Sequence, residues 1–460
     1  MNDNQENIEL DLDIAHKIIK LAESLGAAET EVFMIKMRAT DFSIEKNIIN
    51  FASSAMEFGM GIRVIKDKRL GFGYCTDISN AEKAISDAIS TTKLRNPQEL
   101  KFISKAPTKR ISSIFDQSIL DLSIEDGLDY ANRLISSCKE TDSRVIITGG
   151  GVGYGGGSIG LVTSTGVEIE HSSTGIVGGV STILKDKSVS TGFEYAHSRR
   201  NDIDYANIGK TATELAISGQ NPKPVEPGEY KVMFTPEAIS ELIEFTIIPA
   251  LYGEQAKKDE TFYSNKLGEQ VAAEFLNICD DGTLANGINS APWDDEGEET
   301  RATVLIEDGC LKSYLFDRSS AAEFDEKSTG NAMRTSGMSG GRSYKAEPKT
   351  KVHNFTITSP GKPRDELISE VGDGLLIYEL LGAHTANQTS GTFSVNSPML
   401  FKIKDGAIEC AGKQVMISGN MNKMMERIIA LGNDYKNISG GLSPVAFRIP
   451  SIVFDDVKII

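Results

Sequence analysis

The first half of the chain repeats one order of sequence patterns at an offset of about 110–120 residues. Each repeat begins and ends with apolar residues at helical spacing and has strand-like runs in between. The matching pairs are 12–25 with 124–138, 31–35 with 144–148, 66–74 with 185–195, and 79–93 with 204–218. A shared Lys-Asp-Lys turn alone would mean little, because such turns are common between strands. The common order of four elements predicts two related helix–strands–helix units.

The second half is separated from these units by a segment that cannot continue a helix. Residues 218–228 contain three prolines and two glycines, a composition typical of a linker. We therefore predict a domain at 1–218, a linker at 219–229 and a domain at 230–460.

The second domain is predicted to open with a strand at 230–234 and a helix that Thr235 caps. Pro249 should end or kink that helix. Strands and turns follow, with one further helix expected at about 421–431. The predicted fold class is α+β, with a duplicated helix–strands–helix N-terminal half and a β-rich C-terminal domain.

Charge and cysteine content limit the classes of partner. The formal net charge of -17 disfavours contact with a phosphate backbone, so no nucleic-acid partner is expected. Five widely spaced cysteines without a CxxC pair argue against a disulfide framework and a cysteine-based zinc site. No signal peptide and no apolar run of ~18 residues is found. We expect a cytoplasmic protein without a membrane partner.

Two short motifs resemble sites of known chemistry. Residues 151–156 match GxGxxG, but a dinucleotide site needs a helix next, and 161–170 indicates strand and turn. We interpret the glycines as a β connection. GxSxG occurs around Ser158 and Ser339, but neither has the strand–turn–helix context of a nucleophile.

Acidic groups and histidines give no further site. Asp280-Asp281 and the triplet 294–296 could bind a hard cation or act as paired carboxylates, but acidic residues beside glycine and proline favour solvated turns. None of the five histidines forms an HxH or HxxxH pair. We predict no catalytic residue, no cofactor-binding residue and no metal ligand, so no cofactor.

Several blocks, in order, resemble the TldD/PmbA family over nearly the whole chain. They are Gly59–Val64, Gly71–Tyr74, Lys266–Glu269, Asp294–Gly297, Ser328–Asn331, Ile417–Asn420 and Gly432–Asp434. In this family, TldD-like chains are zinc metallopeptidases with an HExxxH helix and a cysteine ligand near the C-terminus. The motif supplies two imidazoles on adjacent helical turns and a glutamate that activates water.

The resemblance places this motif on residues 244–249, counted back without gaps from Lys266. Glu244 and Pro249 occupy the histidine positions, and Phe245 occupies the glutamate position. No histidine lies between His197 and His353, and no cysteine follows Cys410. The chain thus resembles the TldE (PmbA) branch, which lacks the zinc motif.

The resemblance implies a non-catalytic subunit of a TldD-type zinc metallopeptidase complex that degrades or processes peptides. The implied partners are a TldD-like subunit and unfolded or extended peptides, with a homodimer possible in isolation. Whether the chain is itself an enzyme stays open. The alternatives are a stand-alone hydrolase with an unrecognised site and an interaction protein that modulates a toxin or DNA gyrase.

Overall fold

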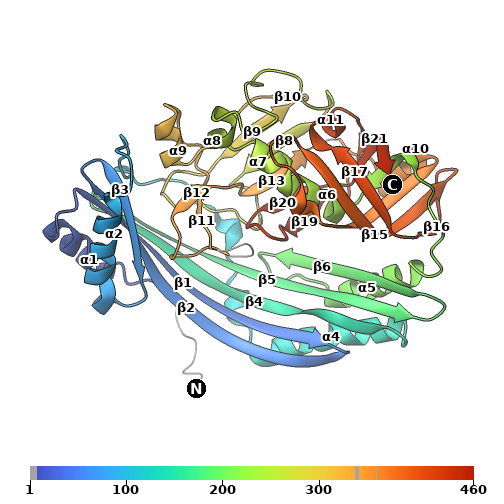
Figure 1. Cartoon of the computed structure of the whole chain (residues 1–460). Coiled ribbons are helices and arrows are strands. Elements are labelled where there is room, and N and C mark those ends of the chain that lie inside the picture. The colour runs from blue at the N-terminus through green and yellow to red at the C-terminus, as the bar shows by residue number, and fades with distance from the viewer. Residues whose placement is uncertain (1–7, 337–340, 359) are drawn as a thin grey trace.

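The computed structural model describes residues 8–336, 341–358 and 360–460. A long, curved sheet lies beneath a second half that is rich in strands (Figure 1). Helices and strands occur in both halves, so the α+β prediction is confirmed. Within the described residues, no helix has the length and apolar character that crossing a membrane requires.

The two repeated units form the two halves of a single six-stranded sheet. Its order is β3-β2-β1-β4-β5-β6. The strands are β1 (Glu29–Glu45), β2 (Ile48–Lys66), β3 (Arg69–Cys75), β4 (Ile146–Thr163), β5 (Glu168–Lys185) and β6 (Val189–Ser198). The first strand of each unit pairs antiparallel at the centre, where Met37 faces Gly157. The predicted duplication is therefore confirmed, and the pairing of β1 with β4 joins the units.

Helices cover one face of the sheet at both ends. Helices α1 (Asp13–Ser24) and α2 (Ala81–Thr92) cover the first unit, and α4 (Ile124–Thr141) and α5 (Tyr205–Ser218) cover the second (Figure 1). Ser123 and Asp126 form a capping box at the start of α4. The short elements η1 (Ile78–Asn80), η2 (Ser112–Ile114) and α3 (Gln117–Leu120) lie in the connections. The helices leave the opposite face of the sheet to the second half.

The glycine-rich segment at 151–156 is part of a strand, so its interpretation as a β connection was wrong. Strand β4 continues through it, and both β1 and β5 pair with it residue by residue. Two neighbouring strands satisfy the backbone on both sides, which outweighs the low strand propensity of glycine.

The second half contains two larger sheets. One has the path β14-β7-β21-β17-β15-β16 and closes on itself, because β14 also pairs with β15; strand β18 lies off this path and pairs with β21. Its strands are β7 (Gly228–Phe234), β14 (Gly374–Leu381), β15 (Thr392–Lys404), β16 (Ala407–Gly412), β17 (Val415–Asn420), β18 (Ile428–Leu431) and β21 (Ile452–Ile459).

The other sheet has the order β10-β9-β8-β13-β20-β19. Its strands are β8 (Asn277–Asp281), β9 (Ala302–Glu307), β10 (Cys310–Leu311), β13 (Asn354–Thr358), β19 (Lys436–Ser439) and β20 (Ala446–Ile449). A separate pair is β11 (Ala332–Arg334) with β12 (Pro348–Thr350). The helical elements are α6 (Pro236–Phe245), α7 (Ile247–Ala250), α8 (Gly253–Lys257), α9 (Arg318–Glu323), α10 (Arg364–Val371), η3 (Ala383–Thr385) and α11 (Met421–Met425).

The helix predicted at 421–431 was correct only in its first part. Helix α11 ends at Met425, and Ile428 begins strand β18, which pairs antiparallel with β21. The methionines are buried as core residues. Pairing with β21 decides the structure of 428–431, although the apolar spacing there also suits a helix.

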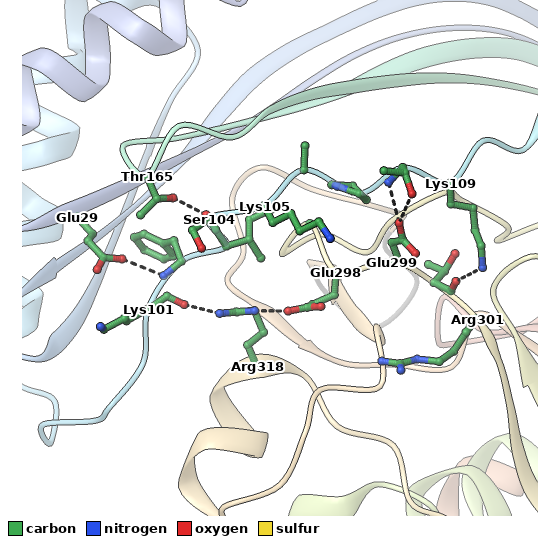
Figure 2. A pocket seen from close by; sticks show the side chains of 17 residues that line it. Glu29, Lys101, Ser104, Lys105, Lys109, Thr165, Glu298, Glu299, Arg301 and Arg318 are labelled. Carbon is green, nitrogen blue, oxygen red and sulfur yellow. Dashed lines mark hydrogen bonds and ion pairs between the residues drawn. The ribbon is translucent and has the colours of Figure 1, made fainter.

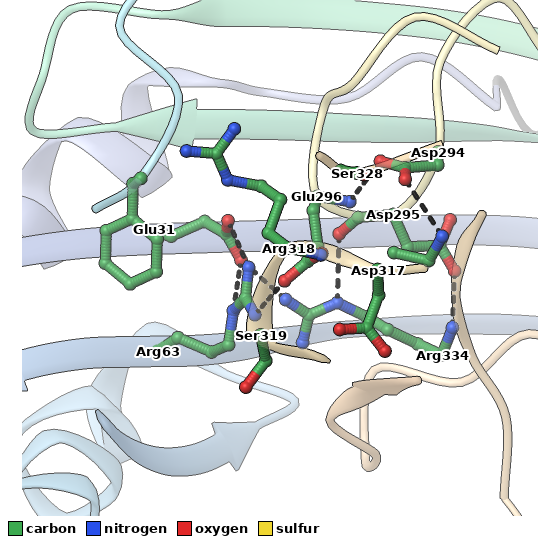
Figure 3. A network of polar contacts seen from close by, with 12 residues as sticks. Glu31, Arg63, Asp294, Asp295, Glu296, Asp317, Arg318, Ser319, Ser328 and Arg334 are labelled. Carbon is green, nitrogen blue, oxygen red and sulfur yellow. Dashed lines mark hydrogen bonds and ion pairs between the residues drawn. The ribbon is translucent and has the colours of Figure 1, made fainter. Parts of the chain in front are cut away.

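A buried network of charged side chains joins the sheet to the second half (Figure 3). Glu31 of β1 accepts two hydrogen bonds of 2.7 Å from Arg63 of β2 and one of 2.6 Å from Arg334 of β11. Arg63 also donates to Glu296 of the second half at 2.6 Å. Burial alone would raise the pKa of Glu31, but Arg63 and Arg334 hold it below its usual value. Glu31 therefore stays ionised.

The acidic residues at 280 and 294–296 were wrongly predicted to be solvated. Asp280, Asp294, Asp295 and Glu296 are all at most 1% exposed. They accept hydrogen bonds instead, as when Asp294 accepts the backbone N–H groups of Glu296 and Ala332 at 2.9 Å. Several of their partners lie in elements distant in sequence, such as Arg63 of β2 and Ala332 of β11, so the local composition gave no sign of them.

Removing one charge from this network should be costly. We expect Arg334→Met to lower the free energy of unfolding by about 3–5 kcal/mol, because Glu31 would keep only Arg63 as a buried partner. The measurement is urea unfolding followed by circular dichroism. Lys83→Met is the control, since its ion pair with Asp87 is exposed and should contribute about 0–1 kcal/mol. Equal losses in both variants would contradict this role.

Candidate functional site

The uncovered face of the sheet and the second half enclose a groove. Side chains alternate between the two faces of a strand. On β4, Val152 and Tyr154 pack with the helices, whereas Ile159 and Leu161 pack with Trp293 of the second half. Odd-numbered positions of this part of β4 therefore face the second half.

Glycines form the floor of this groove. Positions 151, 153, 155 and 157 of β4 all face the second half, and each is glycine. A Cβ atom at Gly155 would lie 2.1 Å from the carbonyl oxygen of Arg38, so the close approach of β1 itself requires glycine here. Strand β4 thus contributes only backbone atoms to the floor over about 20 Å, at ~3.3 Å per residue, and side chains of the neighbouring strands, such as Met37 and Asp41 of β1, lie beside it.

Three adjoining cavities lie along this floor. Their volumes are about 640, 370 and 260 Å³. The first two share Gly153, and the second and third share Ser173 and Arg199. A continuous groove therefore runs from Tyr195 to the loops of the second half.

Two loops of the second half, 286–290 and 439–444, form one wall of the groove. Arg199 donates to the backbone carbonyls of Thr174 at 2.6 Å and Gly287 at 3.2 Å. On the other side, Lys436 donates to Glu194 of β6 and Glu237 of α6. These contacts fix the width of the groove between the two halves.

The segment 244–249 lies behind the second of these loops. Helix α6 ends at Phe245, and Thr246 leaves the helical conformation before α7 begins. The break falls where expected, because the ring of Pro249 would clash with the carbonyl group four residues earlier, that of Phe245. Glu244 is buried and accepts the backbone N–H groups of Gly441 at 2.9 Å and Leu442 at 3.1 Å.

These side chains do not supply the donor set of a catalytic zinc. The carboxylate of Glu244 is already occupied by two backbone donors, and Phe245 packs against the ring of His384, with centroids 6.3 Å apart. Among the described ranges, no group of three or more His, Cys, Asp or Glu residues is arranged to hold a metal ion.

Like charges surround the same helix. Burial, then Glu379 and Glu244, raise the pKa of Glu241 to about 8. Burial also raises the pKa of Glu379. Both groups favour the protonated form more than free carboxyls do, so α6 and the neighbouring β14 carry less negative charge here than their sequences suggest.

A larger cavity of about 950 Å³ lies away from the groove, between residues 101–109 and the second half (Figure 2). Several of its charged side chains bind other parts of the chain. Glu299 accepts the backbone N–H of Thr108 at 2.7 Å, and Arg318 donates to the carbonyl of Lys101 at 2.7 Å. We therefore interpret this cavity as space left where the segment 101–109 packs against the second half.

The residues singled out in the sequence lie in different places. Ser158 is buried inside β4, and its hydroxyl group lies 2.7 Å from that of Ser172, so it is no exposed nucleophile. Ser339 lies outside the described residues. The backbone N–H of His353 donates to Asp280 at 2.9 Å. Sequence reasoning missed the groove; the glycines at alternate positions of 151–157 were the one signal that could have indicated it.

Family models match three parts of the chain. The model for the PmbA/TldA metallopeptidase domain 1 matches residues 30–92, that for the central domain matches 117–220, and that for the C-terminal domain matches 227–460. Together the three matches cover most of the chain and define the class of protein, one related to metallopeptidases. The chain belongs to the PmbA/TldD metallopeptidase family.

Individual relatives agree with this assignment. An uncharacterised protein of Methanocaldococcus jannaschii is 30% identical over 94% of this chain and 98% of its own length. A metalloprotease TldD homologue of Buchnera aphidicola is 25% identical over 90% of this chain and 89% of its own. The crystal structure of TldE from Thermococcus kodakarensis is also 25% identical, with a TM-score of 0.88 over 97% of this chain and 99% of that one. Overall identity therefore does not separate the TldD and TldE branches.

Glu244 should stabilise the loop it binds. In Glu244→Gln the amide offers one acceptor oxygen, so one of the two backbone donors loses its partner. We expect a loss of about 1–3 kcal/mol in the free energy of unfolding and faster amide hydrogen exchange at Gly441 and Leu442. The control is Glu82→Gln, at an exposed position of α2. Unchanged exchange at both amides would rule out this role.

Proposed function

We propose that this chain is a TldE-like, non-catalytic subunit that holds an extended peptide for a TldD-like metallopeptidase partner. One observation carries the proposal: Glu244, Phe245 and Pro249 stand where the family's zinc motif would place its histidines and glutamate. The environment of Glu244 supports it, since a carboxylate that binds two backbone N–H groups is committed to the fold. Such a chain contributes binding surface and no Lewis acid.

The groove supports the peptide part of the proposal. The strand at its floor, β4, presents no side chain to it over about 20 Å, a length that fits roughly six residues of extended chain. Met37, Val177 and Ile288 supply apolar contacts along it. A floor of backbone and small side chains suits peptides of varied sequence, which agrees with a role in peptide degradation or processing.

We also assign the protein to the cytoplasm. All five cysteines are free thiols, and Cys75 and Cys138 are buried. Burial raises the pKa of both thiols, which disfavours the reactive thiolate. A chain without disulfides suits a reducing compartment.

Peptidase activity should require the mixture of this chain with a TldD-like partner. The two would be co-expressed, separated by size-exclusion chromatography and assayed for peptide cleavage. We expect co-elution, with an interface of at least ~1,000 Å², and zinc only in fractions that contain the partner. A partner variant without its motif glutamate is the control for activity. Stoichiometric zinc in this chain alone, or full activity of the partner alone, would overturn the proposal.

Filling the groove should weaken peptide binding and leave the fold intact. Ser173 lines two of the three cavities and is only half-buried, so we expect Ser173→Trp to lower peptide affinity at least tenfold, about 1.4 kcal/mol. Fluorescence anisotropy with a labelled peptide measures the change. Ser86→Trp, at an exposed position of α2, is the matched control. Equal affinities in the two variants would exclude the groove as the binding site.

A further inference from the structure

The smallest of the three cavities, about 260 Å³, has an unusual charge. Arg199 follows β6 and Arg342 comes from the second half, and both line it. Its other lining residues include serines, glycines and apolar side chains, but no carboxylate. In a chain with a net charge of -17, such a place attracts anions.

Arg199 is held rigidly and keeps its charge. Its guanidinium donates to the backbone carbonyls of Thr174, Gly287 and Ile288. Among the described residues, no ion pair of Arg199 is found. Burial, then the neighbouring Arg342, lower its pKa to about 10. Arg199 is therefore still protonated at neutral pH.

Two hydrogen-bond donors at this cavity are shielded from water and have no acceptor in the described part of the chain. Nε of Arg342 lies 3.3 Å from a carboxylate oxygen of Asp295, on the side of the buried network. Its Nη2 is buried and has no hydrogen-bond partner within the described ranges, and the same holds for the hydroxyl group of Ser443. A buried donor without an acceptor costs free energy that a suitable ligand would recover.

His171 adds a third unused group nearby. It lies on the same sheet face as Ser173, which lines the cavity, and its ring packs against Trp293 at 4.8 Å between centroids. Both ring nitrogens are buried without a partner in the part of the chain described. Burial, then Arg342 and Arg199, lower its pKa to about 3. A neutral imidazole adds one N–H donor without further positive charge.

We propose that this cavity binds a carboxylate group of a peptide lying in the groove, through Arg342, Arg199 and Ser443. A carboxylate accepts only, and it is planar, so it matches guanidinium donors. The cavity adjoins the glycine floor, which brings the end or an acidic side chain of an extended peptide to these donors. The inference rests on the proposed peptide-binding function and names the chemistry that this end of the groove recognises.

The test compares three labelled peptides on the purified full-length chain. All consist of alanine and serine with a fluorophore at the N-terminus. One ends in a free carboxylate, one ends in a carboxamide, and one ends in a carboxamide but contains a single glutamate. We expect at least one carboxylate peptide to bind roughly tenfold more tightly than the plain carboxamide. Which one does so identifies the source of the carboxylate.

Arginine variants connect this preference to the cavity. Arg342→Gln should remove the preference, whereas Arg342→Lys, which keeps a charge, should retain part of it. Arg133→Gln is the matched control, because Arg133 is exposed on α4. Thermal unfolding confirms that each variant folds.

The outcomes separate the two proposals. Equal binding of all three peptides, or a preference that survives Arg342→Gln, overturns the carboxylate site and leaves peptide binding intact. No binding of any peptide overturns both.

Discussion

Buried charges that neutralise one another hold the two halves together. Glu31 and Glu296 lie against Arg63 and Arg334, while Asp295 faces Arg342. Each charge would be costly alone in the interior, so the sheet and the second half stabilise one another only in the observed relative position. Arg334 also lies over the ring of Phe33, 4.7 Å from its centroid. Because this network lies at one end of the groove, the position of both groove walls depends on it.

Two different kinds of contact hold the loops of the groove wall in place. At residue 244, where the family resemblance places a metal ligand, a carboxylate binds the loop that forms the groove wall. Arg199 fixes the other loop through backbone carbonyls. Both residues hold the wall in place, and Arg199 also lines the cavity proposed to bind a carboxylate. These contacts suit the role proposed above, a subunit that shapes a peptide site.

Local patterns could be predicted from the sequence, and contacts between distant segments could not. The duplication, the start of α6 at Thr235 and the break before Pro249 follow from periodicity, capping and proline chemistry, which act over a few residues. The acidic triplet at 294–296 was misinterpreted because its partners, Arg63 and Arg334, lie in other elements. Residues 428–431 became a strand because β21 was available as a partner. The division at 219–229 stays a prediction.

The glycine floor has a consequence for what the groove can distinguish. Residues 151–157 of β4 pair with β1 on one side and with β5 on the other, so their amide and carbonyl groups are already engaged in the sheet. The backbone of β4 therefore offers an occupant close contact and no directional bonds, whereas the carboxylate of Asp41 lies beside Gly153. Selectivity must then come from Asp41, the walls and the two ends, and the middle of a bound chain would be distinguished only where it meets Asp41. Such a surface tolerates changes in the middle of its ligand and discriminates by where that ligand stops.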